Sequence, residues 1–145
     1  NEKGELVRTN RVDLPEDIQK ELQRVMKATA GYEEGTLILA LSYGGRSEIA
    51  AAARAIAEDV QRGVLQSSDV DEQAVAARLY APDVPDPDLV IRTSGEMRLS
   101  NFLLWQVSYA ELYVTPVLWP DFRVPEFRKA LAAYARRRRR FGDIR

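Results

Sequence analysis

The sequence predicts an α/β fold, in which a mostly parallel sheet is flanked by helices, within a single domain over residues 1–145. Short, continuous apolar runs alternate along the chain with longer segments of helical periodicity. Continuous apolar runs are typical of strands that are covered on both faces. Strands that alternate with helices favour a parallel sheet. A length of 145 residues suits one domain with one hydrophobic core.

The first half of the chain yields a weak strand at residues 6–9 and a helix that begins at Pro15 and stops near Gly31. Residues 37–41 predict a buried strand. Ser47 then caps a second helix, for which Gly63 supplies the stop signal.

The second half begins with a short helix over residues 71–79 and a loop rich in proline. A buried strand at 89–91, a helix at 101–109 and a core strand at 112–114 come next. The last helix is expected to bury one apolar face, made by Phe127, Leu131, Tyr134 and Phe141.

The composition excludes several classes of chemistry. With no cysteine and no histidine, the chain can form no disulfide, thiol nucleophile or imidazole base. Catalysis would have to use carboxylates, hydroxyls, Arg, Lys, backbone amides or an oxygen-bound metal. The absence of cysteine fits a cytoplasmic location, and the apolar runs are too short for a membrane span.

A run of arginines, Arg136 to Arg140, contrasts with a net charge of only −1. Consecutive residues on a helix point in all directions, so this run does not make one nucleic-acid-binding patch. A helix end also favours cations. We therefore expect no nucleic-acid partner, although a module that binds nucleic acid stays open as a third hypothesis.

The segment from Arg92 to Asn101 (RTSGEMRLSN) carries the strongest functional signal. It lies between a predicted strand end and a predicted helix start, where ligands bind in α/β sheets. Ser100 is placed to cap that helix, whose free amides would attract an anion, and Arg92 and Arg98 offer paired donors to phosphate oxygens. The alternative interpretation is that both arginines form salt bridges with Glu96 and Asp88 while Ser100 only caps the helix.

Other polar and aromatic residues have weaker signals. A lone carboxylate such as Glu111 is usually solvated, although it lies near a predicted sheet edge. The turn at 43–46 is better explained by tight strand-to-helix geometry than by ligand contact. Core or interface packing is the expected role of Trp105, Trp119 and Phe122, rather than a lipid pocket.

At these residues the chain resembles the cis-prenyltransferase family, specifically the undecaprenyl diphosphate synthase type. The matching text is ALSYGGRSEI (40–49), DLVIRTSGEMRLSNFLLWQVSYAELY (88–113), LWPDF (118–122) and RRFG (139–142). The resemblance implies an incomplete undecaprenyl-diphosphate-synthase-like fold. It also implies a reaction in which isopentenyl diphosphate adds to an allylic diphosphate, such as farnesyl diphosphate, with release of pyrophosphate and formation of a cis double bond.

The resemblance also assigns roles to residues. It implies that Arg92, Arg98 and Ser100 hold the diphosphate of isopentenyl diphosphate and that Glu111 helps to bind Mg²⁺. Arg140 and Gly142 match an element that contacts diphosphate across the interface of a homodimer. Peripheral association with a membrane through the lipid product is a further expectation.

The chain departs from the family pattern in two places. Met97 stands where some members have a histidine near the metal, and a thioether is a poor ligand for Mg²⁺. The family's N-terminal motif, which carries the catalytic aspartate and the allylic site, has no counterpart here. We therefore expect the C-terminal part of a synthase, inactive alone. The alternative is a non-catalytic partner subunit of a synthase. Such subunits would be expected to lose residues that bind diphosphate, whereas this chain retains them.

Overall fold

A computed structural model describes residues 14–137. The described residues divide into two compact units, one that ends at Val84 and one that begins at Pro85. Each unit is described by itself, and the predicted single domain over 1–145 stays a prediction. The strand predicted at residues 6–9 lies outside the described residues.

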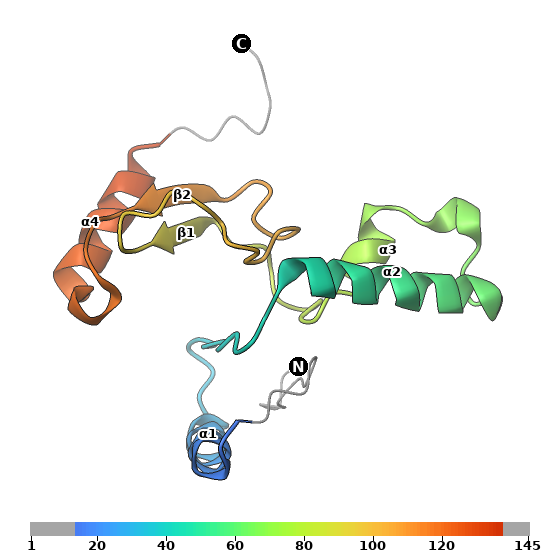
Figure 1. Ribbon diagram of the computed structural model, residues 1–145, viewed down its shortest axis with the longest axis horizontal. Helices are drawn as coiled ribbons and strands as arrows, with labels where there is room; N and C mark the ends of the chain where they lie inside the picture. Colours follow the sequence, from blue (N-terminus) through green and yellow to red (C-terminus); the bar gives the residue numbers. More distant parts are fainter. Residues whose placement is uncertain (1–13, 138–145) are drawn as a thin grey trace. The chain divides into compact units, whose positions relative to one another are not determined.

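The first unit is helical in its described part. It contains α1 (Glu16–Thr29), α2 (Gly45–Gln61), the 3₁₀ turn η1 (Ser67–Asp69) and α3 (Glu72–Ala76) (Figure 1). The predicted start of α1 is confirmed, because Pro15 occupies the cap position and two acidic residues, Glu16 and Asp17, lie in the first turn. The short helix predicted over 71–79 is present but ends at Ala76, and the Asp71 carboxylate caps it by accepting a hydrogen bond from the Ala74 amide at 2.8 Å.

Helix α2 begins earlier than predicted. Its cap residue is Gly44 rather than Ser47, which lies inside the first turn of the helix. Gly63 follows the helix with a φ of 71°, which confirms it as the stop signal because left-handed backbone suits glycine. The buried side of α2 carries Ala52, Ile56 and a single carboxylate, Glu48, which is 1% exposed.

Glu48 forms the polar centre of the first unit. It accepts a hydrogen bond from the Tyr43 hydroxyl, on the loop before α2, and another from the Tyr80 amide at 3.0 Å. The two tyrosine rings pack edge to face with centroids 6.2 Å apart. The buried carboxylate thus ties the loop before α2 and the segment after α3 to helix α2.

The predicted buried strand at 37–41 is wrong. These residues form no strand, and their side chains are exposed, with Leu37 at 84%. A strand exists only where a neighbouring strand completes its hydrogen bonds, and the apolar pattern cannot provide that neighbour.

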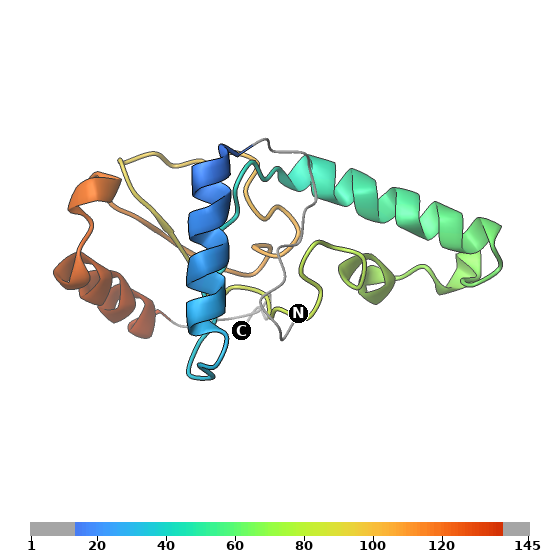
Figure 2. The ribbon, with the colours of Figure 1, turned by 90° about the horizontal axis from the view of Figure 1, so that it is seen from below.

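The second unit contains the predicted parallel strand pair. β1 (Leu89–Arg92) and β2 (Glu111–Val114) pair in parallel, with Leu89 opposite Glu111 and Arg92 opposite Val114. The 3₁₀ turn η2 (Trp119–Asp121) leads to α4 (Val124–Ala135), which packs against β2 (Figures 1 and 2). This is the layered α/β arrangement that the sequence predicts, with two strands in the described residues.

The predicted helix at 101–109 is wrong. This segment forms a series of turns, because Ser100, Asn101 and Leu103 have left-handed φ values of 49°, 65° and 45°. Right-handed helices require φ near −63°, so the segment cannot form one.

The expected apolar face of α4 is only partly buried. Ala130 is fully buried, whereas Phe127 and Leu131 are 45% and 43% exposed. Phe141 lies outside the described residues. Within residues 14–137, no helix combines the length and the apolar character that a membrane crossing requires.

Candidate functional site

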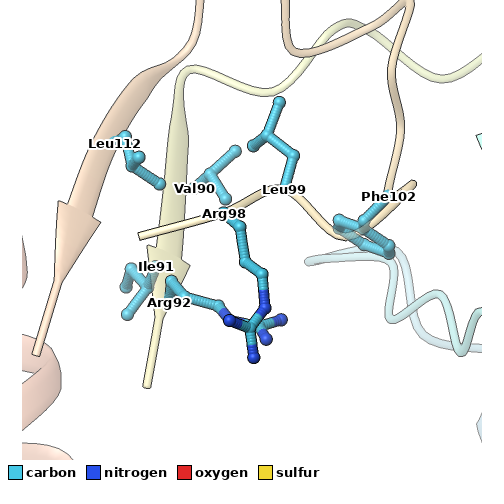
Figure 3. Close-up of a pocket in the computed structure, with 7 residues that line it drawn as sticks. All are labelled: Val90, Ile91, Arg92, Arg98, Leu99, Phe102 and Leu112. Carbon is cyan, nitrogen blue, oxygen red and sulfur yellow. The ribbon is translucent and has the colours of Figure 1, made fainter. Parts of the chain in front are cut away.

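The candidate site is a pocket beside the two paired strands of the second unit. Its volume is about 220 Å³. Seven side chains line it, namely Val90, Ile91, Arg92, Arg98, Leu99, Phe102 and Leu112 (Figure 3). The wall is therefore apolar apart from two guanidinium groups, an arrangement that suits a ligand with an anionic head and a short hydrocarbon tail.

The strand and the loop after it deliver the two arginines to one place. Arg92 is the last residue of β1, and Arg98 lies six positions later in the loop. Figure 3 shows their guanidinium groups side by side, with Leu99 extending away from them. Sequence analysis predicted that these arginines act together, and the structure brings them together.

A shared carboxylate holds the two arginines. One Nη of Arg92 donates to Oε2 of Glu96, and one Nη of Arg98 donates to Oε1 of Glu96 at 2.5 Å. The side chains of Arg92 and Glu96 are about one-third exposed, whereas that of Arg98 is 66% exposed. The salt bridges to Glu96 that the alternative interpretation predicted are therefore present, and they coexist with a pocket.

The charge state of Glu96 follows from these contacts. The hydrogen bond from Arg92 is the main cause that holds the pKa of the Glu96 carboxyl below its ordinary value, and the charges of Arg98 and Arg92 add to this effect. Partial desolvation opposes them. Glu96 is thus a carboxylate at neutral pH.

A hydrogen-bonded turn fixes the backbone next to Glu96. Ser94 and Gly95 have left-handed φ values of 65° and 71°. The Ser94 amide donates to the Val117 carbonyl at 2.9 Å, and the Gly95 amide donates to the Thr115 carbonyl at 2.8 Å. Gly95 suits this conformation because it has no Cβ, and the segment after β2 thereby anchors the turn.

The helix N-terminus predicted as part of the anion site is absent from the segment after Ser100. Ser100 has left-handed backbone and an exposed side chain, so its predicted capping role is wrong. Its predicted contact with a diphosphate stays a prediction, and Ser100 does not line the pocket. Arg140 and Gly142 lie outside the described residues.

Glu111 lies at the other end of the strand pair. It starts β2 opposite Leu89, three ladder steps from the Arg92–Val114 pair, or about 10 Å along the strand. Its Oε2 accepts a hydrogen bond from Arg137 at 2.5 Å, and Arg137 also donates to the Leu112 carbonyl at 2.9 Å. This ion pair joins the end of α4 to the start of β2.

The donor atoms available to Mg²⁺ are limited in the described residues. Between residues 14 and 137, no group of three or more carboxylate, imidazole or thiol side chains could hold a metal. Glu111 still fits as a single ligand, because Arg137 engages only one of its oxygens and Mg²⁺ usually takes one or two carboxylates together with substrate phosphates.

Sequence reasoning missed the apolar part of the pocket. Val90 and Arg92 are two positions apart on a strand and so share one face, a signal that could have placed them together. Leu99 and Phe102 reach the pocket through left-handed turns, which no periodicity indicates. Glu96 was weighed as a salt-bridge partner, but its bridging position between two arginines was not foreseen.

Comparisons with known proteins agree with the resemblance on which these expectations depend. Residues 6–142 match the family model of undecaprenyl diphosphate synthase. The chain belongs to this prenyltransferase family. It is 50% identical over 131 residues to an isoprenyl transferase of Geobacillus kaustophilus, an alignment that covers 90% of this chain and 51% of the relative.

Two further relatives extend the match. The chain is 47% identical over 129 residues to a tritrans,polycis-undecaprenyl-diphosphate synthase (geranylgeranyl-diphosphate specific) of Thermococcus kodakarensis, covering 89% of this chain and 49% of the relative. The crystal structure of lavandulyl diphosphate synthase from Lavandula x intermedia, in complex with dimethylallyl diphosphate, has a TM-score of 0.83 and 41% identity, covering 90% of this chain and 56% of that one. The chain thus spans about half the length of these relatives.

Proposed function

We propose that this chain binds isopentenyl diphosphate for cis-prenyl chain elongation. In this reaction, isopentenyl diphosphate adds to an allylic diphosphate, pyrophosphate leaves, and the new double bond is cis. The observation that carries the proposal is the placement of Arg92 and Arg98 side by side at an apolar pocket of about 220 Å³. Membership of the prenyltransferase family supports it.

The pocket provides two kinds of contact that suit this substrate. The guanidinium groups of Arg92 and Arg98 offer forked donors to phosphate oxygens. The apolar side chains of Val90, Leu99 and Phe102 can surround a short branched hydrocarbon. With its diphosphate and its hydrocarbon both held, isopentenyl diphosphate would have a defined direction relative to the allylic partner. This lowers the entropic part of the activation barrier of the condensation.

Three further residue roles are part of the proposal. Ser100 and the Arg140–Gly142 element contact diphosphate, the latter across a homodimer interface. When bound, Mg²⁺ supplies positive charge that offsets the diphosphate charge, and Glu111 offers it a carboxylate oxygen. A cytoplasmic location and peripheral association with a membrane through the lipid product stay predictions.

The test is a calorimetric titration of isopentenyl diphosphate, with Mg²⁺, into the chain and into Arg98→Ala. We expect saturable binding that Arg98→Ala weakens by about 2–3 kcal/mol, because one forked charged contact is lost. Arg128→Ala, at an exposed position on α4, is the matched control and should bind normally. Circular dichroism of each sample checks the fold. No binding by a folded chain, or equal weakening in both variants, would contradict the proposal.

A further inference from the structure

Glu96 engages only a few of the N–H donors of each arginine. It engages one nitrogen of Arg92 and one of Arg98, through its two different oxygens. Among the described residues 14–137, neither guanidinium makes a further hydrogen bond or ion pair. Because a guanidinium carries five N–H donors, most donors of both groups remain available to an anion while Glu96 stays in place.

Without a shared counter-ion, the two cations would not stay together. Like charges repel, and a long side chain that is 66% exposed, as that of Arg98 is, has many accessible rotamers. The two carboxylate oxygens of Glu96 reduce both effects, because each fixes the position of one guanidinium. A carboxylate and a phosphate match the same guanidinium fork, so the arginines already have a geometry that suits an anion.

The backbone around Glu96 is suited to serve as a fixed reference for both side chains. The turn that precedes it is tied by two amides to the Thr115 and Val117 carbonyls. Thr115 is 4% exposed, and its own amide donates to the Arg92 carbonyl at 2.9 Å. Arg92 and the turn are therefore held by the same segment, which limits their relative movement.

We propose that Glu96 is a positioning residue that sets the two guanidiniums for diphosphate and stays on them when the anion binds. This inference rests on the proposed function, because it concerns the same pocket. The opposite role is that of an internal competitor, which the diphosphate must displace. The two roles predict opposite signs: removing the Glu96 charge weakens anion binding if the residue positions, and strengthens it if the residue competes.

The experiment titrates inorganic pyrophosphate into the full chain and into Glu96→Gln. The glutamine oxygen can accept from one guanidinium, whereas its NH₂ group turns a donor toward the other. We therefore expect binding about tenfold weaker, since one arginine is no longer ordered before the anion arrives. Glu126→Gln removes the same charge from an ion pair on α4 and should leave binding unchanged, which controls for net charge.

A double-mutant cycle separates positioning from a general structural effect. If Glu96 acts through Arg98, then Glu96→Gln should change binding by less than about twofold when Arg98→Met is already present. Glu96→Asp keeps the charge but reaches less far, so it should give an intermediate loss. This variant also provides the test if circular dichroism shows that Glu96→Gln does not fold.

The outcomes distinguish this inference from the proposed function. Wild-type binding that Arg98→Met weakens and that Glu96→Gln leaves unchanged or strengthens would overturn the positioning role alone. An equal loss from Glu96→Gln with and without Arg98 would also overturn it. No pyrophosphate binding by a folded wild-type chain would count against the proposed function and would remove the positioning role with it.

Discussion

Two glutamates in this chain serve their neighbours in different ways. Glu48, in the first unit, is 1% exposed and accepts hydrogen bonds from a tyrosine hydroxyl and a backbone amide. Glu96, in the second unit, is about one-third exposed and bridges two arginines. Glu48 is surrounded by protein, whereas Glu96 stands beside a pocket that an anion can enter.

The difference shows how environment separates a carboxylate that folding satisfies from one that lies at a candidate site. A buried carboxylate stays charged at an acceptable cost only when donors satisfy it, so its partners are fixed by folding. A partly exposed carboxylate contributes little to stability, because water screens its ion pairs. Two arginines gathered at such a place are therefore better explained by a ligand than by stability.

The largest expected effect comes from Glu48→Ala. Removing the carboxylate leaves the Tyr43 hydroxyl and the Tyr80 amide without this acceptor inside the unit, so the free energy of unfolding should fall by about 3 kcal/mol. Urea unfolding followed by circular dichroism measures the change. The control is Glu58→Ala, an exposed glutamate on the same helix, which should change the value by less than about 0.5 kcal/mol. A similar fall in the free energy of unfolding of both variants would contradict a special structural role for Glu48.

A smaller effect is expected from Tyr43→Phe. This change keeps the ring contact with Tyr80 and removes only the hydroxyl that donates to Glu48. The free energy of unfolding should fall by about 1 kcal/mol in the same urea experiment. Tyr32→Phe is the matched control, because the Tyr32 side chain is 70% exposed. A loss in Tyr43→Phe as large as that of Glu48→Ala would show that the hydroxyl, not the carboxylate, dominates this cluster.

The smallest effect concerns the titration of Glu96. Because its folded-state pKa lies below the unfolded value, its ion pairs stabilise the folded chain above the ordinary carboxyl pKa. That contribution is lost as the pH falls through the folded pKa. Carboxyl NMR signals should give Glu96 a midpoint below the ordinary value of a glutamate carboxyl.

Variants of the two arginines test the cause of the low pKa of Glu96. Arg92→Met should move the midpoint of Glu96 upward, because the hydrogen bond from Arg92 is the main cause of the depressed pKa. Arg98→Met should move it upward by less. A midpoint that neither variant changes would show that the arginines do not set the charge of Glu96.

The sequence predicted features that depend on neighbouring residues and missed those that depend on distant ones. The start of α1 and the Gly63 stop signal follow local rules, and both are present. The strand at 89–91 is present because β2 provides its pairing partner. The strand expected at 37–41 needed a pairing partner that its apolar pattern could not specify. The helix expected at 101–109 was replaced by left-handed turns that bring Phe102 to the pocket.

The candidate site shows the same division. Residue types together with a predicted sheet edge favoured an anion site at Arg92 and Arg98 over simple salt bridges, and anion binding there stays a prediction. The Ser100 cap failed, because it required a helix that does not form. The apolar lining of the pocket could not be predicted, since it combines residues of β1, the loop after it and Leu112 of β2.

The most direct test of the central claim is a crystal structure of the chain with isopentenyl diphosphate. The account predicts diphosphate oxygens within hydrogen-bond distance of both Arg92 and Arg98, with the hydrocarbon between Leu99 and Phe102. A diphosphate bound elsewhere, with both arginines still engaged only by Glu96, would contradict it.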